Sequence, residues 1–272
     1  MAWLVKKQII SMILQLKDIR LSFTNARSEV FNLLNGVNLK VRRGYITALV
    51  GGNGAGKTTL FNIISGFQKD YEGEVILDGR HLNGLAAHKI SLMGIGRLFQ
   101  GRQLMGDLTL MENMKIASDD KTGEFPFDSL FRRKKIALSE KAKEEKAIAI
   151  LKRLFGEGNK YLDMLDRKAS GFSYGEQRLI ALACLLMGND SLLLLDEPTA
   201  GVNPVYIDTI KDIIRKMVEE DGLTVLLIEH NMHFVRDVAD YCAYLDEGRI
   251  VKVGDVNEVL DDKEVRNSYL GL

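Results

Sequence analysis

Apolar and polar positions alternate in the first part of the chain, the pattern of strands that bury one face and expose the other. Three stretches carry this alternation or a short apolar run bounded by turn residues: residues 14–23, 37–41 and 74–77. Turn signals follow the second and third of them, at Arg42-Arg43-Gly44 and Asp78-Gly79. We therefore expect an antiparallel β layer at the beginning of the chain.

Uninterrupted apolar runs replace this alternation further on. They have no polar face, which is typical of strands in a parallel sheet that is covered on both sides: residues 46–50, 191–195 and 223–228. Two alternating runs flank Asp246-Glu247-Gly248, which predicts a hairpin near the end of the chain. Together the patterns predict an α/β core with the antiparallel layer beside it.

Helical spacing dominates between about residues 100 and 175. Residues 111–116 and 139–155 predict helices, and the second of these has one charged and one apolar face. Residues 118–131 are polar and contain Pro126, so we interpret them as an insertion or surface segment. Further helices are predicted at residues 173–187, after the cap Asn203-Pro204, and near residues 256–260.

The composition is that of an ordinary globular protein with a sizeable core: 272 residues, 46% hydrophobic and 27% charged. Lysine plus arginine and aspartate plus glutamate both number 37, so the charge gives no reason to expect a nucleic-acid partner. Cys184 and Cys242 have no metal-ligand spacing, which favours a reducing compartment. No apolar stretch reaches the roughly 18–20 residues that a membrane span needs. We expect residues 1–13 to be an N-terminal extension.

A glycine-rich stretch between a predicted strand and a predicted helix carries the clearest chemistry: Gly51-Gly52-Asn53-Gly54-Ala55-Gly56-Lys57-Thr58-Thr59. It fits the phosphate-loop pattern G-x-x-x-x-G-K-[ST]. The glycines let backbone N–H groups turn inward around a phosphate at a helix N-terminus. Lys57 can reach the β- and γ-phosphates of a nucleotide, and the Thr58 hydroxyl can bind Mg²⁺. We predict that Gly51 and Asn53 to Thr59 bind the nucleotide; a chance turn is disfavoured by the flanking elements.

Asp196 and Glu197 end the second apolar run. In a chain with a phosphate loop, an acidic residue at the end of a buried strand is the expected second Mg²⁺ contact, so we assign this role to Asp196. Glu197 is then placed to polarise the attacking water. Without the phosphate loop, a solvent-facing acidic pair would be the better interpretation.

The segment Gly171-Phe172-Ser173-Tyr174-Gly175-Glu176-Gln177 predicts a capping box, with Ser173 as the helix cap and Glu176 three residues on. Such a helix N-terminus also offers N–H groups to an anion. One nucleotide needs only the N-terminus after the phosphate loop. We therefore expect Ser173, Tyr174, Gly175 and Glu176 to contact a nucleotide that another copy holds.

The order of these motifs resembles the ATP-binding cassette ATPases of ABC transporters, over nearly the whole chain from about Leu14. The resemblance implies that Gln100 senses Mg²⁺ and the γ-phosphate and links to a membrane subunit, and that His230 contacts the γ-phosphate. It implies that Ala200-Gly201-Val202-Asn203 crosses a dimer interface. Phe23 is the candidate for stacking on adenine, with Phe31 as its rival. Glu197, His230, Gln100 and Lys57 would form the catalytic set.

Residues 172–176 stand where the family has its signature, and we call them the signature. Four further segments are similar to the branched-chain amino acid importer ATPases: the Ser-Tyr-Gly of the signature, residues 96–100 with 108–113, residues 228–232, and the ending 268–271. The ATPase of lipopolysaccharide export shares part of this pattern and is the rival. A soluble cassette without a transport role and a P-loop kinase fit the motifs less well. The chain departs from the usual family pattern at Gly52, Phe172, Glu176 and Cys184, where proline, leucine, glutamine and arginine are common.

The resemblance implies a P-loop NTPase (RecA-like) core with an antiparallel β subdomain and an inserted helical subdomain. We expect the core at residues 14–100 and 173–272 and the helical subdomain at 101–172. The implied activity is ATP hydrolysis that drives transport, with ATP and Mg²⁺ as ligands. The implied partners are membrane permease subunits, a second cassette and an extracytoplasmic solute-binding protein. The implied location is the cytoplasmic face of the cell membrane.

Overall fold

Two compact units make up the chain in the computed structural model, which describes residues 11–24, 30–101, 104–120, 122 and 133–270. The first unit comprises Met1–Arg97, Ser191–Glu197 and Val218–Leu272, and the second comprises Leu98–Asp190 and Pro198–Met217. By this division, the helix after Ser173 belongs to the second unit. The predicted extent of the helical subdomain, between residues 100 and 173, stays a prediction.

A six-stranded sheet is the centre of the first unit, and its strands lie in the order β10-β9-β3-β8-β7-β6. The predicted parallel strands are confirmed: β3 pairs in parallel with β8 and β9, and β7 with β8. Every residue of β3, β7 and β8 is buried, because the sheet is covered on both faces. The bounds are β3 (Ile46–Val50), β6 (Ile95–Leu98), β7 (Leu192–Asp196), β8 (Thr224–Ile228), β9 (Tyr241–Asp246) and β10 (Arg249–Asp255).

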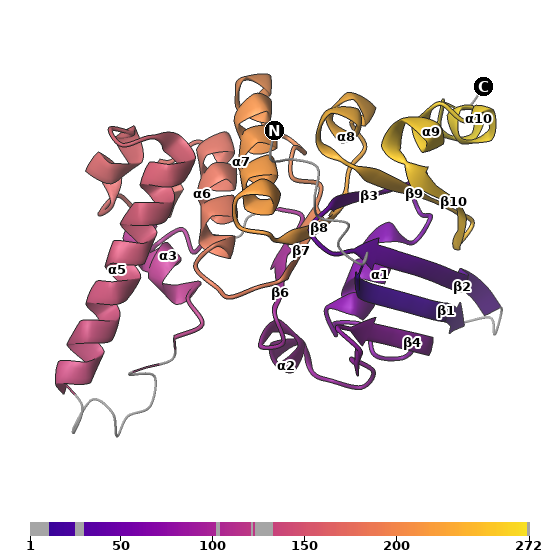
Figure 1. The fold of residues 1–272 in the computed structure, drawn as a ribbon, viewed down its shortest axis with the longest axis horizontal. Coiled ribbons are helices and arrows are strands. Elements are labelled where there is room, and N and C mark those ends of the chain that lie inside the picture. Colours follow the sequence, from indigo (N-terminus) through magenta and orange to yellow (C-terminus); the bar gives the residue numbers. More distant parts are fainter. Residues whose placement is uncertain (1–10, 25–29, 102–103, 121, 123–132, 271–272) are drawn as a thin grey trace, which may run out of the picture. The chain divides into compact units, whose positions relative to one another are not determined.

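An antiparallel sheet in the order β2-β1-β4-β5 is the second layer of this unit (Figure 1). Its strands are β1 (Met12–Thr24), β2 (Val30–Arg42), β4 (Glu72–Leu77) and β5 (Arg80–His81). Strand β1 begins at Met12, and Ile13 is fully buried. The last two residues of the predicted extension therefore belong to the sheet, because Ile13 continues its buried face; residues 1–10 lie outside the described residues.

Helix α1 (Lys57–Ile64) packs between the layers because Leu60, Phe61, Ile63 and Ile64 are all buried. These side chains join one hydrophobic core with the inward residues of β1, β2, β7 and β8. The remaining helices of this unit are α2 (Ala87–Ser91), α8 (Met232–Val238), α9 (Val256–Leu260) and α10 (Lys263–Leu270). The hairpin of β9 and β10 and the helix at 256–260 were both predicted and are confirmed.

The second unit is helical. Its elements are α3 (Leu110–Ile116), α5 (Arg133–Phe155), η1 (Lys160–Met164), η2 (Ala169–Gly171), α6 (Tyr174–Leu185), η3 (Pro204–Tyr206) and most of α7 (Ile207–Glu219). Helix α5 begins six residues before the predicted start at Ser139, and Asn203-Pro204 opens a 3₁₀ turn ahead of α7. Most of the predicted surface segment at residues 118–131 lies outside the described residues.

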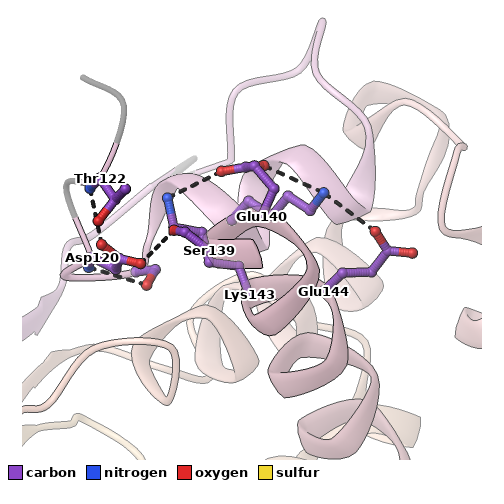
Figure 2. Close-up of polar contacts among 8 residues, drawn as sticks. Asp120, Thr122, Ser139, Glu140, Lys143 and Glu144 are labelled. Atoms are coloured by element: carbon purple, nitrogen blue, oxygen red, sulfur yellow. Dashed lines mark hydrogen bonds and ion pairs between the residues drawn. The ribbon is translucent and has the colours of Figure 1, made fainter. Parts of the chain in front are cut away.

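Polar contacts fix the segment after α3 against α5 (Figure 2). Asp120 accepts hydrogen bonds from the Ser139 hydroxyl and from the Thr122 backbone N–H, and these bonds lower its pKa to about 2, the Ser139 bond having the largest effect. Lys115 on α3 lies 3.5 Å from Glu140 and 3.4 Å from Glu144 on α5. Ion pairs this exposed add little stability.

Candidate functional site

The glycine-rich loop lies between β3 and α1, as predicted. Gly56 caps α1 with a φ of 100°, and a Cβ atom there would lie 2.7 Å from Leu34 Cδ2. A Cβ atom on Gly51 would lie only 2.1 Å from the Leu245 carbonyl oxygen. Both positions therefore require glycine, and the backbone can close around a group of phosphate size.

Lys57 is buried in this loop, and its Nζ donates to the carbonyl oxygens of Gly51 (2.7 Å) and Gly52 (2.9 Å). Burial lowers its pKa, while the nearby carboxylates of Glu197 and Asp196 oppose that shift. The ammonium is thus held at the loop by its backbone carbonyl groups. Thr58 is exposed at the first turn of α1, and Thr59 is half-buried behind it.

Asp196, Glu197 and His230 gather at the carboxyl ends of β7 and β8. Asp196 is 1% exposed. Glu197 has a φ of 49°, a left-handed conformation that costs a non-glycine residue about 1–2 kcal/mol. Its N–H donates to the Ile228 carbonyl oxygen at 2.9 Å, and its Oε1 lies 3.3 Å from His230 Nε2. The strained backbone therefore turns Glu197 toward His230.

Glu229 holds His230 in place, and no pattern in the sequence pointed to this role. Its buried side chain accepts hydrogen bonds from the backbone N–H groups of His230 (3.0 Å) and Asn231 (3.4 Å). Asn231 then caps α8 by accepting from the Phe234 N–H at 3.1 Å. The histidine thus lies between a buried carboxylate and a capped helix.

Arg97 is the second residue whose role the sequence did not reveal. Its guanidinium donates to Asp196 Oδ2 (3.3 Å), Asn62 Oδ1 (2.9 Å) and Ser65 Oγ (2.7 Å). Both members of the ion pair are buried, with side chains 6% and 1% exposed. Burial lowers the pKa of Arg97, and Asp196 opposes this shift. The sequence signal for this role was an arginine in a buried strand just before Phe99-Gln100. A buried cation needs a partner, so such an arginine indicates a nearby buried anion.

Phe23 and Phe31 lie directly opposite each other on β1 and β2. Opposed residues of an antiparallel pair point to the same face of the sheet, so the two candidates are neighbours. Their exposed fractions, 48% and 64%, leave both rings able to contact a planar ligand. Asn53 and Gly54 of the loop are also exposed.

The predicted capping box of the second unit is confirmed: Ser173 is the N-cap of α6, and Glu176 bonds back to it. A Cβ atom on Gly175 would lie 2.4 Å from the Tyr206 ring, so a side chain at this position would displace that ring. Tyr174 beside it is exposed. The N-terminus of α6 therefore has close backbone packing on one side and exposed groups on the other.

Arg178 on α6 is the third residue whose role the sequence did not reveal. It is buried and donates to the carbonyl oxygens of Phe99 (3.0 Å) and Gly101 (3.3 Å), on either side of Gln100. It also donates to the Pro198 carbonyl oxygen at 3.1 Å. The signature helix thus fixes the backbone around Gln100. Lys57, Asp196, Glu197 and His230 belong to the first unit, and Gln100 and the signature belong to the second.

Comparison with known proteins shows the family. The family model described as ABC transporter matches residues 34–200. This chain belongs to the ABC transporter family. The high-affinity branched-chain amino acid transport ATP-binding protein BraF of Pseudomonas aeruginosa is 35% identical over 238 residues, which cover 88% of this chain and 91% of BraF. The chain is an ATP-binding subunit and an ATPase of this family.

Solved structures agree with the fold. A nucleotide-free ATP-binding cassette from an ABC transporter matches with a TM-score of 0.77 and 32% identity, over 96% of this chain and all of that one. A dimeric cassette in a post-hydrolysis state, bound to ADP and Pi, matches with a TM-score of 0.71 and 25% identity, over 89% of this chain and 98% of that one. The fold is therefore that of an ABC ATPase, as expected. Within the described residues, no helix is both long and apolar enough to cross a bilayer.

Proposed function

We propose that this ABC ATPase drives the uptake of branched-chain amino acids or similar small polar solutes through partner membrane subunits. The observation that carries the catalytic part is the gathering of Lys57, Asp196, Glu197 and His230 around one glycine-rich loop. The printed name and the 35% identity of BraF support the substrate class. We place the subunit at the cytoplasmic face of the membrane, with a solute-binding protein outside.

Each residue of the first unit has a stated task in this proposal. The loop N–H groups and Lys57 bind the β- and γ-phosphates, and Phe23 and Phe31 contact the adenine. Glu197 accepts a proton from water as the water oxygen bonds to the γ-phosphorus. The bond from that phosphorus to the bridging β-oxygen breaks, which gives ADP and phosphate. His230, 3.3 Å from Glu197, orients this carboxylate and donates to the γ-phosphate.

The donor set fits Mg²⁺. A threonine hydroxyl and a carboxylate are hard oxygen ligands, as Mg²⁺ prefers, and nucleotide sites complete its shell with phosphate oxygens and water. Thr58 and Asp196 of the first unit would hold the ion. When bound, it would neutralise charge on the phosphates.

The second unit completes the site in trans. Two cassettes close head to tail, and the N-terminus of α6, with Ser173 and Gly175, meets the γ-phosphate that the other cassette holds. The partner is a second copy or a homologous cassette. A dimeric relative that holds ADP and Pi supports this arrangement. Loss of the γ-phosphate removes a bridge between the two cassettes, so that they separate and the attached permease changes state.

Release of phosphate from ATP by the purified chain tests the chemistry. We expect Lys57→Ala and Glu197→Gln to abolish turnover, and His230→Ala to lower it by about 10²–10³-fold, a typical effect of removing one oriented polar group. His233→Ala, on the exposed side of α8, is the matched control and should retain wild-type turnover. Equal activity of the His230 and His233 variants would contradict the assigned roles.

Uptake by cells tests the substrate. The gene is deleted in its own host and restored as wild type or as Lys57→Ala, and uptake of radiolabelled leucine, isoleucine and valine is measured. We expect uptake to fall on deletion and to return only with the wild type. Unchanged uptake of all three amino acids would contradict the substrate class and leave the ATPase assignment intact.

A further inference from the structure

Glu176 creates an electrostatic conflict at the N-terminus of α6. Its Oε2 accepts hydrogen bonds from the Ser173 N–H (2.9 Å) and from the Ser173 hydroxyl (2.8 Å). The hydroxyl proton that would serve a phosphate is therefore directed at a carboxylate. A negative charge at this point also repels the γ-phosphate. A glutamine, the usual family residue, would bring no charge.

Lys160 resolves this conflict. Its Nζ donates to the other carboxylate oxygen, Oε1, and the Glu176 side chain is 15% exposed. Burial alone would raise the pKa of Glu176, and the hydrogen bonds from Lys160 and Ser173 outweigh it, so the pKa is lowered. The carboxylate is thus ionised and paired, and the two side chains together have no net charge.

The position of Lys160 is set by the structure around it. Asn159 caps η1 by accepting from the Tyr161 N–H at 3.0 Å, and its Nδ2 donates to the carbonyl oxygens of Leu151 (3.1 Å) and Gly156 (2.7 Å). The buried Tyr161 ring packs on Phe155, with ring centroids 4.7 Å apart. The backbone of Lys160 therefore belongs to a turn that is anchored on α5.

The Tyr161 ring also connects this turn to the signature. Its centroid lies 6.2 Å from that of Phe172, which directly precedes Ser173. The Lys160 ammonium lies 5.4 Å from the centroid of the Tyr161 ring. Tyr161 therefore lies against both Lys160 and Phe172, the residue before the N-cap of α6.

We propose that Lys160 is a positioning residue that neutralises Glu176 and so allows the N-terminus of α6 to accept the γ-phosphate of ATP held by a second cassette. This inference rests on the proposed function, because it needs a phosphate that arrives in trans. The lysine does not touch the phosphate. Its positive charge offsets the negative charge of Glu176. The net charge at the signature is then close to that with the usual, uncharged glutamine.

ATP-driven dimerisation measures this role directly. All variants carry Glu197→Gln, which blocks turnover, and sedimentation velocity at fixed protein concentration gives the ATP concentration for half-maximal dimer. Lys160→Met leaves a bare carboxylate, and we expect it to need about tenfold more ATP or worse. Lys160→Arg should stay within about threefold of the parent, because it keeps the charge. Glu176→Gln should need less ATP than the parent.

The double variant decides between two roles of the lysine. If Lys160 acts through Glu176, then Lys160→Met with Glu176→Gln returns to within about threefold of the parent, a large coupling in a double-mutant cycle. If Lys160 binds phosphate itself, the double variant stays as weak as Lys160→Met, and the inference is overturned. Lys152→Ala, which breaks an exposed pair with Glu157 at 2.9 Å, is the control and should match the parent.

Two further outcomes separate the inference from the proposed function. A dimerising parent whose Lys160→Met variant needs no more ATP overturns the inference alone. A parent that binds ATP and stays monomeric at saturating ATP overturns the inference for two copies of this chain, and leaves a homologous cassette as the partner in the proposed function. A fluorescent ATP analogue, titrated into monomers, confirms that the phosphate loop is intact in each variant, since Lys160 is half-exposed and lies in the other unit.

Discussion

Replacement of Arg97 by methionine tests how the buried Asp196 carboxylate is held. The substitution keeps most of the side-chain volume and removes the charge. It deletes the donors to Asp196 Oδ2 (3.3 Å), Asn62 Oδ1 (2.9 Å) and Ser65 Oγ (2.7 Å). Asp196 then keeps its buried charge and loses the guanidinium that pairs with its Oδ2.

The size of the effect follows from burial. Loss of one partner of a buried ion pair costs about 3–5 kcal/mol, since the remaining charge stays out of water. This is a large part of the ~5–15 kcal/mol by which proteins of ordinary stability are folded. At about 2–4 °C for each kcal/mol, the melting temperature should fall by roughly 6–20 °C. Removal of the second charge as well, in Arg97→Met with Asp196→Asn, should restore part of the loss.

Thermal and urea unfolding, followed by far-UV circular dichroism without nucleotide, measures the change. Arg236→Met is the matched control, because Arg236 pairs with Asp261 at 2.9 Å where the side chains are 40% and 61% exposed. An exposed pair of this kind contributes about 0–1 kcal/mol. Equal effects of the Arg97 and Arg236 substitutions would refute the argument, as would a double variant no more stable than Arg97→Met.

Three further predictions concern other buried groups. Arg178→Ala frees the backbone on both sides of Gln100, so kcat should fall by about 10–100-fold while ATP binding to the monomer is unchanged; equal kcat in the variant and the wild type would contradict this. Burial and a neighbouring carboxylate raise the pKa of Asp190 to about 7, so stability falls as the pH rises from about 4 to about 7 and is level above that. Asp190→Asn should abolish this fall in stability, and at pH 8 it should be more stable than the wild type by up to about 4 kcal/mol. Urea unfolding at several pH values measures both effects. A variant whose stability still falls between pH 4 and pH 7 would contradict the prediction. Burial raises the pKa of Cys242 to about 12, so iodoacetamide at pH 8 should alkylate this thiol only after unfolding. Mass spectrometry that finds Cys242 alkylated in the native protein would contradict this prediction.

The local features of the fold were predictable from the sequence. The buried strands β3, β7 and β8 carry continuous apolar runs, and the capping box at Ser173 depends on residues three positions apart. The phosphate loop was predictable because its glycines, lysine and threonine are contiguous. Short elements such as α2, with five residues, carry too few positions to show a period.

Long-range contacts were not predictable in this way. Arg97 and Asp196 are 99 positions apart in the chain and meet only because β6 and β7 belong to one sheet. The choice between Phe23 and Phe31 depended on the register of β1 and β2, which places both on one face. Pattern reasoning shows which residues are polar or apolar, and the pairing of strands decides which of them meet.

The central claim is that ATP joins two cassettes, with Lys57 of one and Ser173 of the other on the same γ-phosphate. The most direct test is the mass of the Glu197→Gln protein, measured by size exclusion with light scattering. The protein is run without nucleotide and then with ATP in the absence of Mg²⁺. We predict a monomer without ATP and a dimer with it, and a monomer in both conditions when Ser173→Arg is added. A Ser173→Arg variant that still dimerises, or a parent that binds ATP and stays monomeric as the sole cassette, would contradict a composite site formed by this chain with itself.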